Sequence, residues 1–155
     1  MPKTDHNAVI IPWWREGGVA MTYVMDATLT HPHYRGQKQV RIPGGGGKAG
    51  ESTCQTATRE LEEETGLIVD NEGDLVFIDE IWKGGHRKTA YLVSLESCSG
   101  ELRKEVLHEL DADLDPPRPA SFSEAVRVVH QTRRNNFNHN ALVRAHWKIE
   151  RGSKG

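Results

Sequence analysis

A run of four glycines followed by an acidic helix constrains this chain more than any other part of its sequence. The glycines occupy residues 44–47, and the following residues, 52–65, are rich in helix formers up to Gly66. Each glycine costs about 0.5–1 kcal/mol of chain entropy relative to alanine, so a run of them is tolerated where the backbone approaches a ligand closely. Glycine is also a common residue just after a helix. The segment therefore predicts a loop followed by a helix of about four turns.

The predicted helix carries an unusual density of carboxylates. Residues 51–64 hold five glutamates and one arginine. Residues three and four apart share a helix face, so Glu60, Glu63 and Glu64 converge, while Leu61 faces a core. The helix dipole opposes each negative charge near the C-terminus by about 0.3–1 kcal/mol. Hard oxygen ligands become favourable when they bind Mg²⁺ or Mn²⁺, so we expect a metal site; the alternative is an acidic face in contact with solvent.

The overall composition is that of one ordinary cytoplasmic domain. The chain has 155 residues, and 20 Lys and Arg against 22 Asp and Glu give a net charge of −2. This balance argues against a dedicated binder of nucleic acids or of anionic membranes. The sequence has no signal-peptide pattern and no membrane-length apolar run, and its two cysteines are too few for a disulfide scaffold. We expect a single domain over residues 1–155, with residues 1–5 and 152–155 disordered.

Short strands and a few helices follow one another irregularly along the rest of the chain. Apolar patterning predicts strands at residues 7–12, 19–26, 39–42, 75–82 and 89–95, and an extended segment at 105–114. A flexible loop at 83–88 would join the fourth and fifth strands. Capping-box spacing at Ser121 predicts a second helix up to Arg133, and residues 139–149 predict a third. The irregular order favours an α+β fold or an α/β/α sandwich over a doubly wound sheet.

The glycine run and the acidic helix together resemble the Nudix box, the motif of the Nudix hydrolase family. The box reads G-x5-E-x7-R-E-U-x-E-E-x-G-U, where U is a bulky aliphatic residue. Its nine defined positions are filled here by Gly45, Glu51, Arg59, Glu60, Leu61, Glu63, Glu64, Gly66 and Leu67. The resemblance implies a Nudix-type α/β/α sandwich with a mixed central sheet. It also implies an enzyme that uses Mg²⁺, or Mn²⁺ in its place, to hydrolyse a nucleoside diphosphate linked to another group.

The resemblance implies a role for the acidic positions of the box. Glu60, Glu63 and Glu64 would be metal ligands, and the carbonyl group of Gly44 would add a further ligand. One of the glutamates, Glu60 or Glu63, would also orient or deprotonate the attacking water. The remaining two charged positions, Arg59 and Glu51, would orient the cluster through ion pairing and hydrogen bonding.

Residues outside the box are expected to complete the site. Many family members recruit one more acidic residue from a later loop, and we expect Glu105 in that role, with Glu101 and Glu109 as alternatives. The cations that are candidates for binding substrate phosphates are Arg41, Lys48 and Arg35. The alternative for each of them is that it is an ordinary charged residue of the protein surface.

The substrate class is narrowed by elimination. ADP-sugar hydrolases of the family commonly have a proline beyond the box, and this chain has no proline between Pro43 and Pro116. The tyrosine typical of dinucleoside polyphosphate hydrolases is missing from its usual place, where Gly84 and Gly85 occur. We therefore expect a nucleoside triphosphate pyrophosphohydrolase, a house-cleaning enzyme. Hydrolysis of ADP-ribose or nucleotide sugars, or of dinucleoside polyphosphates, is the alternative.

Two further hypotheses keep the same fold with another role. A sensor that binds a nucleotide or RNA would use the basic and aromatic residues at 133–137, together with Lys148 and Arg151. Such a sensor has little reason to retain every carboxylate of the acidic helix. A prenyl diphosphate isomerase would use a catalytic cysteine, for which Cys54 lies within the box. We expect a nucleotide-type small-molecule substrate, no membrane or nucleic-acid partner, and a homodimer, as in many family members.

Overall fold

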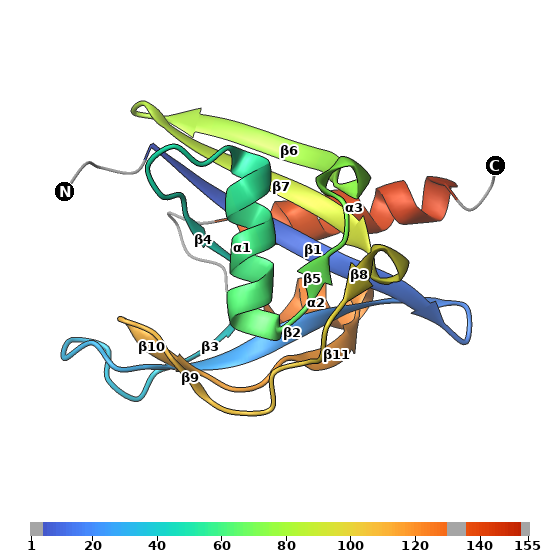
Figure 1. Cartoon of the computed structure of the whole chain (residues 1–155). Coiled ribbons are helices and arrows are strands. Elements are labelled where there is room, and N and C mark those ends of the chain that lie inside the picture. The colour runs from blue at the N-terminus through green and yellow to red at the C-terminus, as the bar shows by residue number, and fades with distance from the viewer. Residues whose placement is uncertain (1–4, 130–135, 153–155) are drawn as a thin grey trace.

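The chain folds into a mixed β-sheet with helices on both faces (Figure 1). The computed structural model describes residues 5–129 and 136–152. Within these residues the main sheet has nine strands in the order β6-β7-β1-β2-β10-β9, with β3 and β11 also pairing with β2 and β4 pairing with β1. The strands are β1 (His6–Glu16), β2 (Val19–Leu29), β3 (Lys38–Arg41), β4 (Gly44–Gly46), β6 (Val76–Lys83), β7 (His86–Ser94), β9 (Leu107–His108), β10 (Ala112–Leu114) and β11 (Arg118–Ser121).

The helices and a small second sheet complete the architecture. Strands β5 (Ile68–Val69) and β8 (Cys98–Ser99) form an antiparallel pair. The helices are α1 (Thr53–Thr65), α2 (Phe122–Val128) and α3 (Phe137–Gly152), with the short 3-10 helices η1 (Glu72–Asp74) and η2 (Leu95–Ser97). No helix in the described part of the chain combines the length and apolar character that crossing a membrane requires.

Strand β1 is buried on both faces, because its alternate side chains enter two different cores. Ala8 and Ile10 pack in the core that α1 covers, together with Leu61 of that helix. Val9 and Ile11 face the opposite way, into the core formed with α2 and α3. Strand β1 pairs in parallel with β7 and antiparallel with β2. The expected α/β/α sandwich with a mixed sheet is confirmed.

Local signals fix both ends of α1, and Gly66 ends the helix as expected from the sequence. The Ser52 hydroxyl accepts a hydrogen bond from the backbone N–H of Gln55 (3.1 Å), and the Gln55 side chain accepts one from the backbone N–H of Ser52 (2.9 Å). Gly66 ends the helix in the left-handed conformation, with φ of 87°, and its N–H donates to the carbonyl of Glu62. The helix therefore places its acidic residues at a defined position and rotation.

The glycine run differs from the expected loop. Residues 44–46 form strand β4, which pairs antiparallel with the start of β1 so that Asn7, Ala8 and Val9 lie opposite the three glycines. The expectation of a loop was wrong because a strand can be specified by its partner. Glycines carry no β-propensity of their own, and β1 lies far away in sequence.

Other boundaries also shift. Strands β1 and β2 extend beyond the predicted residues 7–12 and 19–26, and the predicted loop at 83–88 shrinks to Gly84 and Gly85. The segment 105–114 forms two short paired strands. Helix α2 ends at Val128, before Arg133, which lies outside the described residues, and α3 begins at residue 137. Asp5 and Gly152 are part of the described structure, whereas the other residues expected to be disordered lie outside it.

A distant arginine supplies the positive charge that the last turn of α1 lacks. Arg103 donates from Nε to the carbonyl of Glu64 (2.7 Å), in the last turn of α1, and from Nη1 to the carbonyl of Leu114 (3.1 Å). It also donates to the carbonyls of Glu105 and Asp115. Carbonyls at a helix C-terminus carry partial negative charge and need donors, so this guanidinium stabilises α1 and ties it to β10.

We expect Arg103→Met to lower the free energy of unfolding by about 2–3 kcal/mol, because several partly buried carbonyls lose their donor at once. Chemical denaturation measures this change. Lys104→Met is the matched control, since Lys104 is exposed, and it should stay within about 0.5 kcal/mol of the parent. Equal unfolding free energies for the two variants would show that Arg103 does not secure α1.

Candidate active site

A cavity of about 540 Å³ lies where the acidic helix meets the glycine strand. Its lining comes from β1, β3, β4, β7, α1, the turn between β9 and β10, and the N-terminal end of α3, together with neighbouring loop residues. Five carboxylates belong to this lining. One of them, Asp111, pairs with Arg41, and we call the other four the acidic cluster: Glu60, Glu63, Glu64 and Glu109. The structure thus brings three glutamates of α1 together in one cavity, as their helical spacing predicts.

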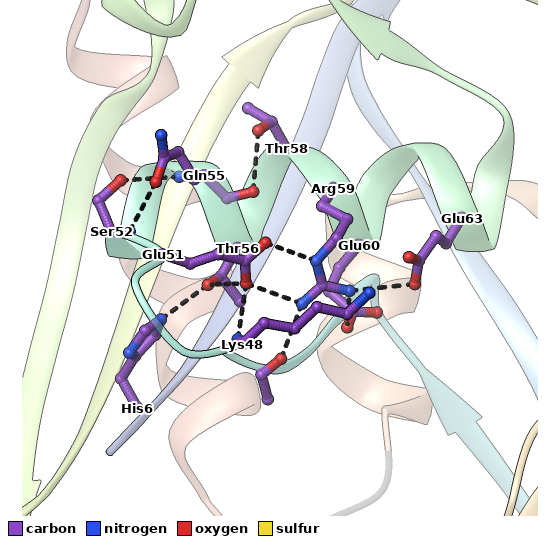
Figure 2. A network of polar contacts seen from close by, with 11 residues as sticks. His6, Lys48, Glu51, Ser52, Gln55, Thr56, Thr58, Arg59, Glu60 and Glu63 are labelled. Carbon is purple, nitrogen blue, oxygen red and sulfur yellow. Dashed lines mark hydrogen bonds and ion pairs between the residues drawn. The ribbon is translucent and has the colours of Figure 1, made fainter. Parts of the chain in front are cut away.

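Arg59 is the centre of the polar contacts around the acidic cluster (Figure 2). Its guanidinium holds Glu51 in a bidentate pair, with Nε–Oε2 at 2.7 Å and Nη2–Oε1 at 3.0 Å. Nη1 contacts Glu60 at 3.0 Å and Glu63 at 3.2 Å, and Nη2 donates to the carbonyl of Gly46 at 2.9 Å. One side chain therefore connects three carboxylates to the glycine strand.

Strand β4 approaches α1 so closely that only glycine fits. A Cβ atom on Gly45 would lie 2.6 Å from Oε1 of Glu60, whose side chain is almost fully buried. The backbone N–H of Gly44 donates to Oε1 of Glu64 at 2.7 Å, and Glu64 is only 6% exposed. Gly45 is therefore explained by contact with a buried carboxylate, whereas a Cβ atom on Gly44 would lie 2.6 Å from the carbonyl oxygen of Ala8 on the neighbouring strand β1.

Burial raises the pKa of some carboxylates in this region, whereas hydrogen bonding to Arg59 lowers the pKa of another. Burial raises the pKa of Glu64 to about 8, against the opposing effect of the hydrogen bond from Gly44, and the nearby charges of Glu60 and Glu109 raise it further. Burial likewise raises the pKa of Glu60. In contrast, the hydrogen bonds from Arg59 lower the pKa of Glu51 to about 2. Glu51 thus stays ionised, whereas the ionised form of Glu64 would be stabilised by a bound cation.

The donor chemistry of the acidic cluster fits a hard divalent cation, because every side chain in it offers carboxylate oxygens. Within residues 5–129 and 136–152, however, no three acidic, His or Cys side chains are already arranged as a metal site. Arg59 holds Glu60 and Glu63, and the Glu63 side chain is 49% exposed. Cation binding would therefore require these two carboxylates to turn from Arg59. The carbonyl of Gly44 stays a predicted ligand.

The later acidic residue that reaches the cavity is Glu109, and the choice of Glu105 is corrected. Glu105 is exposed and does not line the cavity, whereas Glu109 is half-buried beside Glu64. The physical reason is the tight turn between β9 and β10, closed by the N–H of Glu109 on the carbonyl of Ala112 at 2.9 Å. That turn was not apparent from the sequence, which indicated one extended segment.

We expect Glu109→Gln to lower kcat by about tenfold or more and Glu105→Gln to leave it within about twofold, because only Glu109 belongs to the acidic cluster. Steady-state kinetics under saturating Mg²⁺ compares the two variants. The reverse order of effects would restore Glu105 to the site.

The three candidate phosphate-binding cations are placed differently. Arg41 lines the cavity and pairs with Asp111, with Nη2–Oδ2 at 3.0 Å. Lys48 is exposed outside the lining, and its backbone N–H donates to Oε1 of Glu51 at 2.7 Å. Arg35 lies in an exposed turn and is not part of the lining either. Only Arg41 is thus brought to the acidic cluster.

Several cavity residues were not predicted from the sequence. Asn7 and Lys88 lie on neighbouring strands in register and both line the cavity, and Asn138 adds a polar group from α3. His86 holds the Asn7 side chain, with Nε2–Oδ1 at 2.6 Å. The pairing of β1 with β7 brings Asn7 and Lys88 together, and no local sequence pattern predicts that pairing. The alternation of β1 alone could have indicated that Asn7 and Val9 share a face.

Comparisons with known proteins agree with this geometry. The NUDIX domain family matches residues 5–131. A search of curated protein sequences gave no significant match. Solved structures of the same fold include a NUDIX hydrolase, described as putative, from Listeria monocytogenes (TM-score 0.66, 19% identity, 95% of each chain covered).

Two further structures are similar. One comes from a study of MutT from Aliivibrio salmonicida and Vibrio cholerae (TM-score 0.59, 16% identity, 89% of this chain and 96% of that chain covered). The other is an Ap4A hydrolase from C. elegans (TM-score 0.57, 14% identity, 93% and 98% covered). At these identities the likeness concerns the fold, while the family match spans most of the chain. This chain therefore belongs to the NUDIX family, the family of the Nudix hydrolases.

Proposed function

We propose that this protein is a Mg²⁺-dependent hydrolase of a phosphoanhydride bond in a nucleoside diphosphate linked to another group. The observation that carries the proposal is the acidic cluster, in which Glu60 and Glu64 are almost fully buried. The guanidinium of Arg59 that contacts Glu60 is shared with Glu51 and Glu63, so the negative charge of this region is only partly compensated. An arrangement so unfavourable by itself is expected where metal binding compensates for it. Mn²⁺, which prefers similar ligands, is the expected substitute.

In this proposal Glu60, Glu63, Glu64 and the carbonyl of Gly44 hold the metal. Bound Mg²⁺ would neutralise phosphate charge, acidify water and stabilise the leaving phosphate. The protein groups orient the reactants. Glu60 or Glu63 accepts a hydrogen bond from the attacking water and takes its proton, while the pair of Arg59 and Glu51 keeps the cluster in place.

Cations on the cavity lining would bind the substrate. Arg41 and Lys88 both contribute to the lining, and guanidinium and ammonium groups form charge-assisted hydrogen bonds with phosphate oxygens. Lys48 and Arg35 lie outside this lining and have no assigned role in substrate binding. The phosphates would thus lie between the metal and these two cations.

A nucleoside triphosphate is the preferred substrate class. The preference rests on the missing proline beyond the box and on Gly84 and Gly85, which occupy the place of the dinucleoside polyphosphate tyrosine. The similar solved structures come from a MutT study and from an Ap4A hydrolase, so the fold itself does not separate the classes. A cytoplasmic location and a homodimer stay predictions.

The competing hypotheses receive less support. Cys54 packs against the core that α1 covers and does not line the cavity, which argues against its use in an isomerase. Of the residues proposed for RNA binding, Arg133, Arg134 and Asn135 lie outside the described structure, and Phe137 is buried.

The proposal is tested by release of phosphate or pyrophosphate from nucleoside triphosphates, ADP-ribose, nucleotide sugars and dinucleoside polyphosphates, each with Mg²⁺ and with a chelator. We expect turnover of nucleoside triphosphates that the chelator abolishes. Metal-dependent turnover of another group only would reassign the substrate class. No turnover by the folded protein would favour a nucleotide sensor.

A further inference from the structure

We propose that His6 and Thr56 are positioning residues that act through Glu51 and Arg59 on the acidic cluster. Both lie outside the defined positions of the box, on β1 and α1 respectively. The inference rests on the proposed function, because it assigns these residues to the orientation of that site. Figure 2 shows the contacts that connect them to Arg59.

A continuous chain of short contacts leads from the start of β1 to Arg59. Nδ1 of His6 lies 2.7 Å from Oδ1 of Asp5, and Nε2 lies 2.7 Å from Oγ1 of Thr56. The Thr56 hydroxyl then donates to Oε1 of Glu51 at 2.9 Å. The same Glu51 carboxylate holds Arg59 in the bidentate pair. Three side chains thus lie between the exposed Asp5 carboxylate and the guanidinium that contacts the cluster.

The proton count fixes the direction of these hydrogen bonds. Thr56 has one hydroxyl proton, which it donates to Glu51, so Nε2 of His6 must donate to the Thr56 oxygen. Nδ1 faces an Asp5 carboxylate, which accepts hydrogen bonds. Both ring nitrogens of His6 therefore face groups that accept hydrogen bonds. The imidazole holds the Thr56 hydroxyl in the rotation that serves Glu51.

Close packing restricts the position of the His6 ring. The residue is only 3% exposed, and its backbone carbonyl accepts from the N–H of Gly47 at 2.8 Å. A Cβ atom on Gly47 would lie 2.1 Å from Nε2 of His6, so the glycine is required where the ring packs. Gly47 lies after the three glycines of β4 and is not one of the defined box positions. The contact with His6 accounts for it.

The hydrogen bonds to Glu51 fix the orientation of its carboxylate. Oε1 of Glu51 accepts from three donors: the Thr56 hydroxyl, the Lys48 backbone N–H and Nη2 of Arg59. If the hydroxyl is removed, the carboxylate can rotate, and the bidentate pair with Arg59 loosens with it. Arg59 also contacts Glu60 and Glu63, so the loosening reaches two residues of the acidic cluster.

The test compares variants that remove or retain one hydroxyl. We expect Thr56→Val to lower kcat about tenfold with KM within about twofold, and Thr56→Ser to restore kcat. Thr22→Val is the matched control. Thr22 is fully buried and donates one hydrogen bond, to the carbonyl of Pro12 at 2.6 Å, away from the acidic cluster. Its variant loses the same group and should leave kcat unchanged.

A second readout does not depend on turnover. The Nε–H proton of Arg59 is held by Glu51, so its exchange with solvent, followed by NMR in the metal-free protein, reports the tightness of the pair. We expect exchange to become several-fold faster in Thr56→Val and to be unchanged in Thr56→Ser and Thr22→Val. His6→Met, which lacks a donor, should follow Thr56→Val. His6→Gln, which retains a donor, should follow the parent.

The outcomes separate this inference from the proposed function. Faster Arg59 Nε–H exchange in Thr56→Val and His6→Met supports the positioning role even if no substrate of the panel is hydrolysed. Unchanged exchange in both variants would overturn it, even in an active enzyme. If Thr56→Val does not fold, the two His6 variants decide the question in the same way.

Discussion

Glu64→Gln should lower turnover by at least about a hundredfold while leaving the fold intact. The substitution retains the shape of the side chain and an oxygen that can accept the hydrogen bond from Gly44. It removes the negative charge of the most deeply buried carboxylate of the cluster, and a neutral amide is a poor ligand for Mg²⁺. Turnover at saturating Mg²⁺, together with a thermal denaturation curve, measures both effects.

Glu62→Gln is the control within the same helix turn. Glu62 is exposed and does not line the cavity, so its variant makes the same chemical change without touching the cluster. It should keep turnover within about twofold of the parent. If Glu64→Gln retained near-parental activity at saturating Mg²⁺, Glu64 would not be a metal ligand and the proposed site would have to be redrawn.

The parts of the fold that could be predicted are those whose signals are local. Helix α1 begins with a capping box and ends at a glycine, and both signals lie within its own residues. Its acidic face follows from the spacing of three and four residues. The alternation of β1 between two cores also agrees with the expected sandwich, because a strand buried on both faces reads as a continuous apolar run.

The parts that could not be predicted depend on contacts between distant residues. Gly44, Gly45 and Gly46 form a strand only because β1 lies beside them. Glu109 reaches the cluster through a turn that an extended reading of residues 105–114 does not contain. Arg103 caps α1 from a segment that begins after the second sheet, and nothing near it in sequence indicates this. The glycine strand and Arg103 thus depend on partners far away along the chain. The turn at Glu109 is local, and it was missed because residues 105–114 were interpreted as one extended segment.

The candidate site shows the same division. The family resemblance indicated the box residues, and the structure gathers Glu51, Arg59, Glu60, Glu63 and Glu64 around one cavity edge. The relation of Thr56 to the site was available in principle. Thr56 lies four residues before Glu60 and therefore on the same side of the helix. The partner of Thr56 was not available, because His6 belongs to another element and meets it only in the folded chain.

The stability of the metal-free protein should fall as pH rises from about 5 to about 8. The pKa of Glu64 is raised from 4.5 to about 8 by burial, so the folded state retains a proton that the unfolded state has already lost. The stabilisation is fully present below the unfolded pKa and is lost as pH rises toward the folded pKa. Glu60, whose pKa is also raised, acts in the same direction. Glu51, whose pKa is lowered to about 2, changes stability only at more acidic pH.

Mg²⁺ should counteract this loss, because the cation takes the place of the proton. About 10 mM Mg²⁺ should therefore raise the melting temperature more at about pH 8.5 than at about pH 6. In the absence of metal, Glu64→Gln should unfold with a weaker pH dependence and should exceed the parent in stability at about pH 8.5 by about 1–3 kcal/mol. Glu62→Gln should keep the parental slope, since its side chain is exposed.

Thermal and chemical denaturation across this pH range measures these differences. The pH dependence of stability and the response of stability to Mg²⁺ should change together in Glu64→Gln, which a purely structural role of Glu64 would not require. If Glu64 destabilises the metal-free fold when it is ionised, then a cation bound to the same carboxylate should remove that destabilisation. If Glu64→Gln kept both the parental slope and the parental response to Mg²⁺, the buried carboxylate would be neither the titrating group nor the metal ligand.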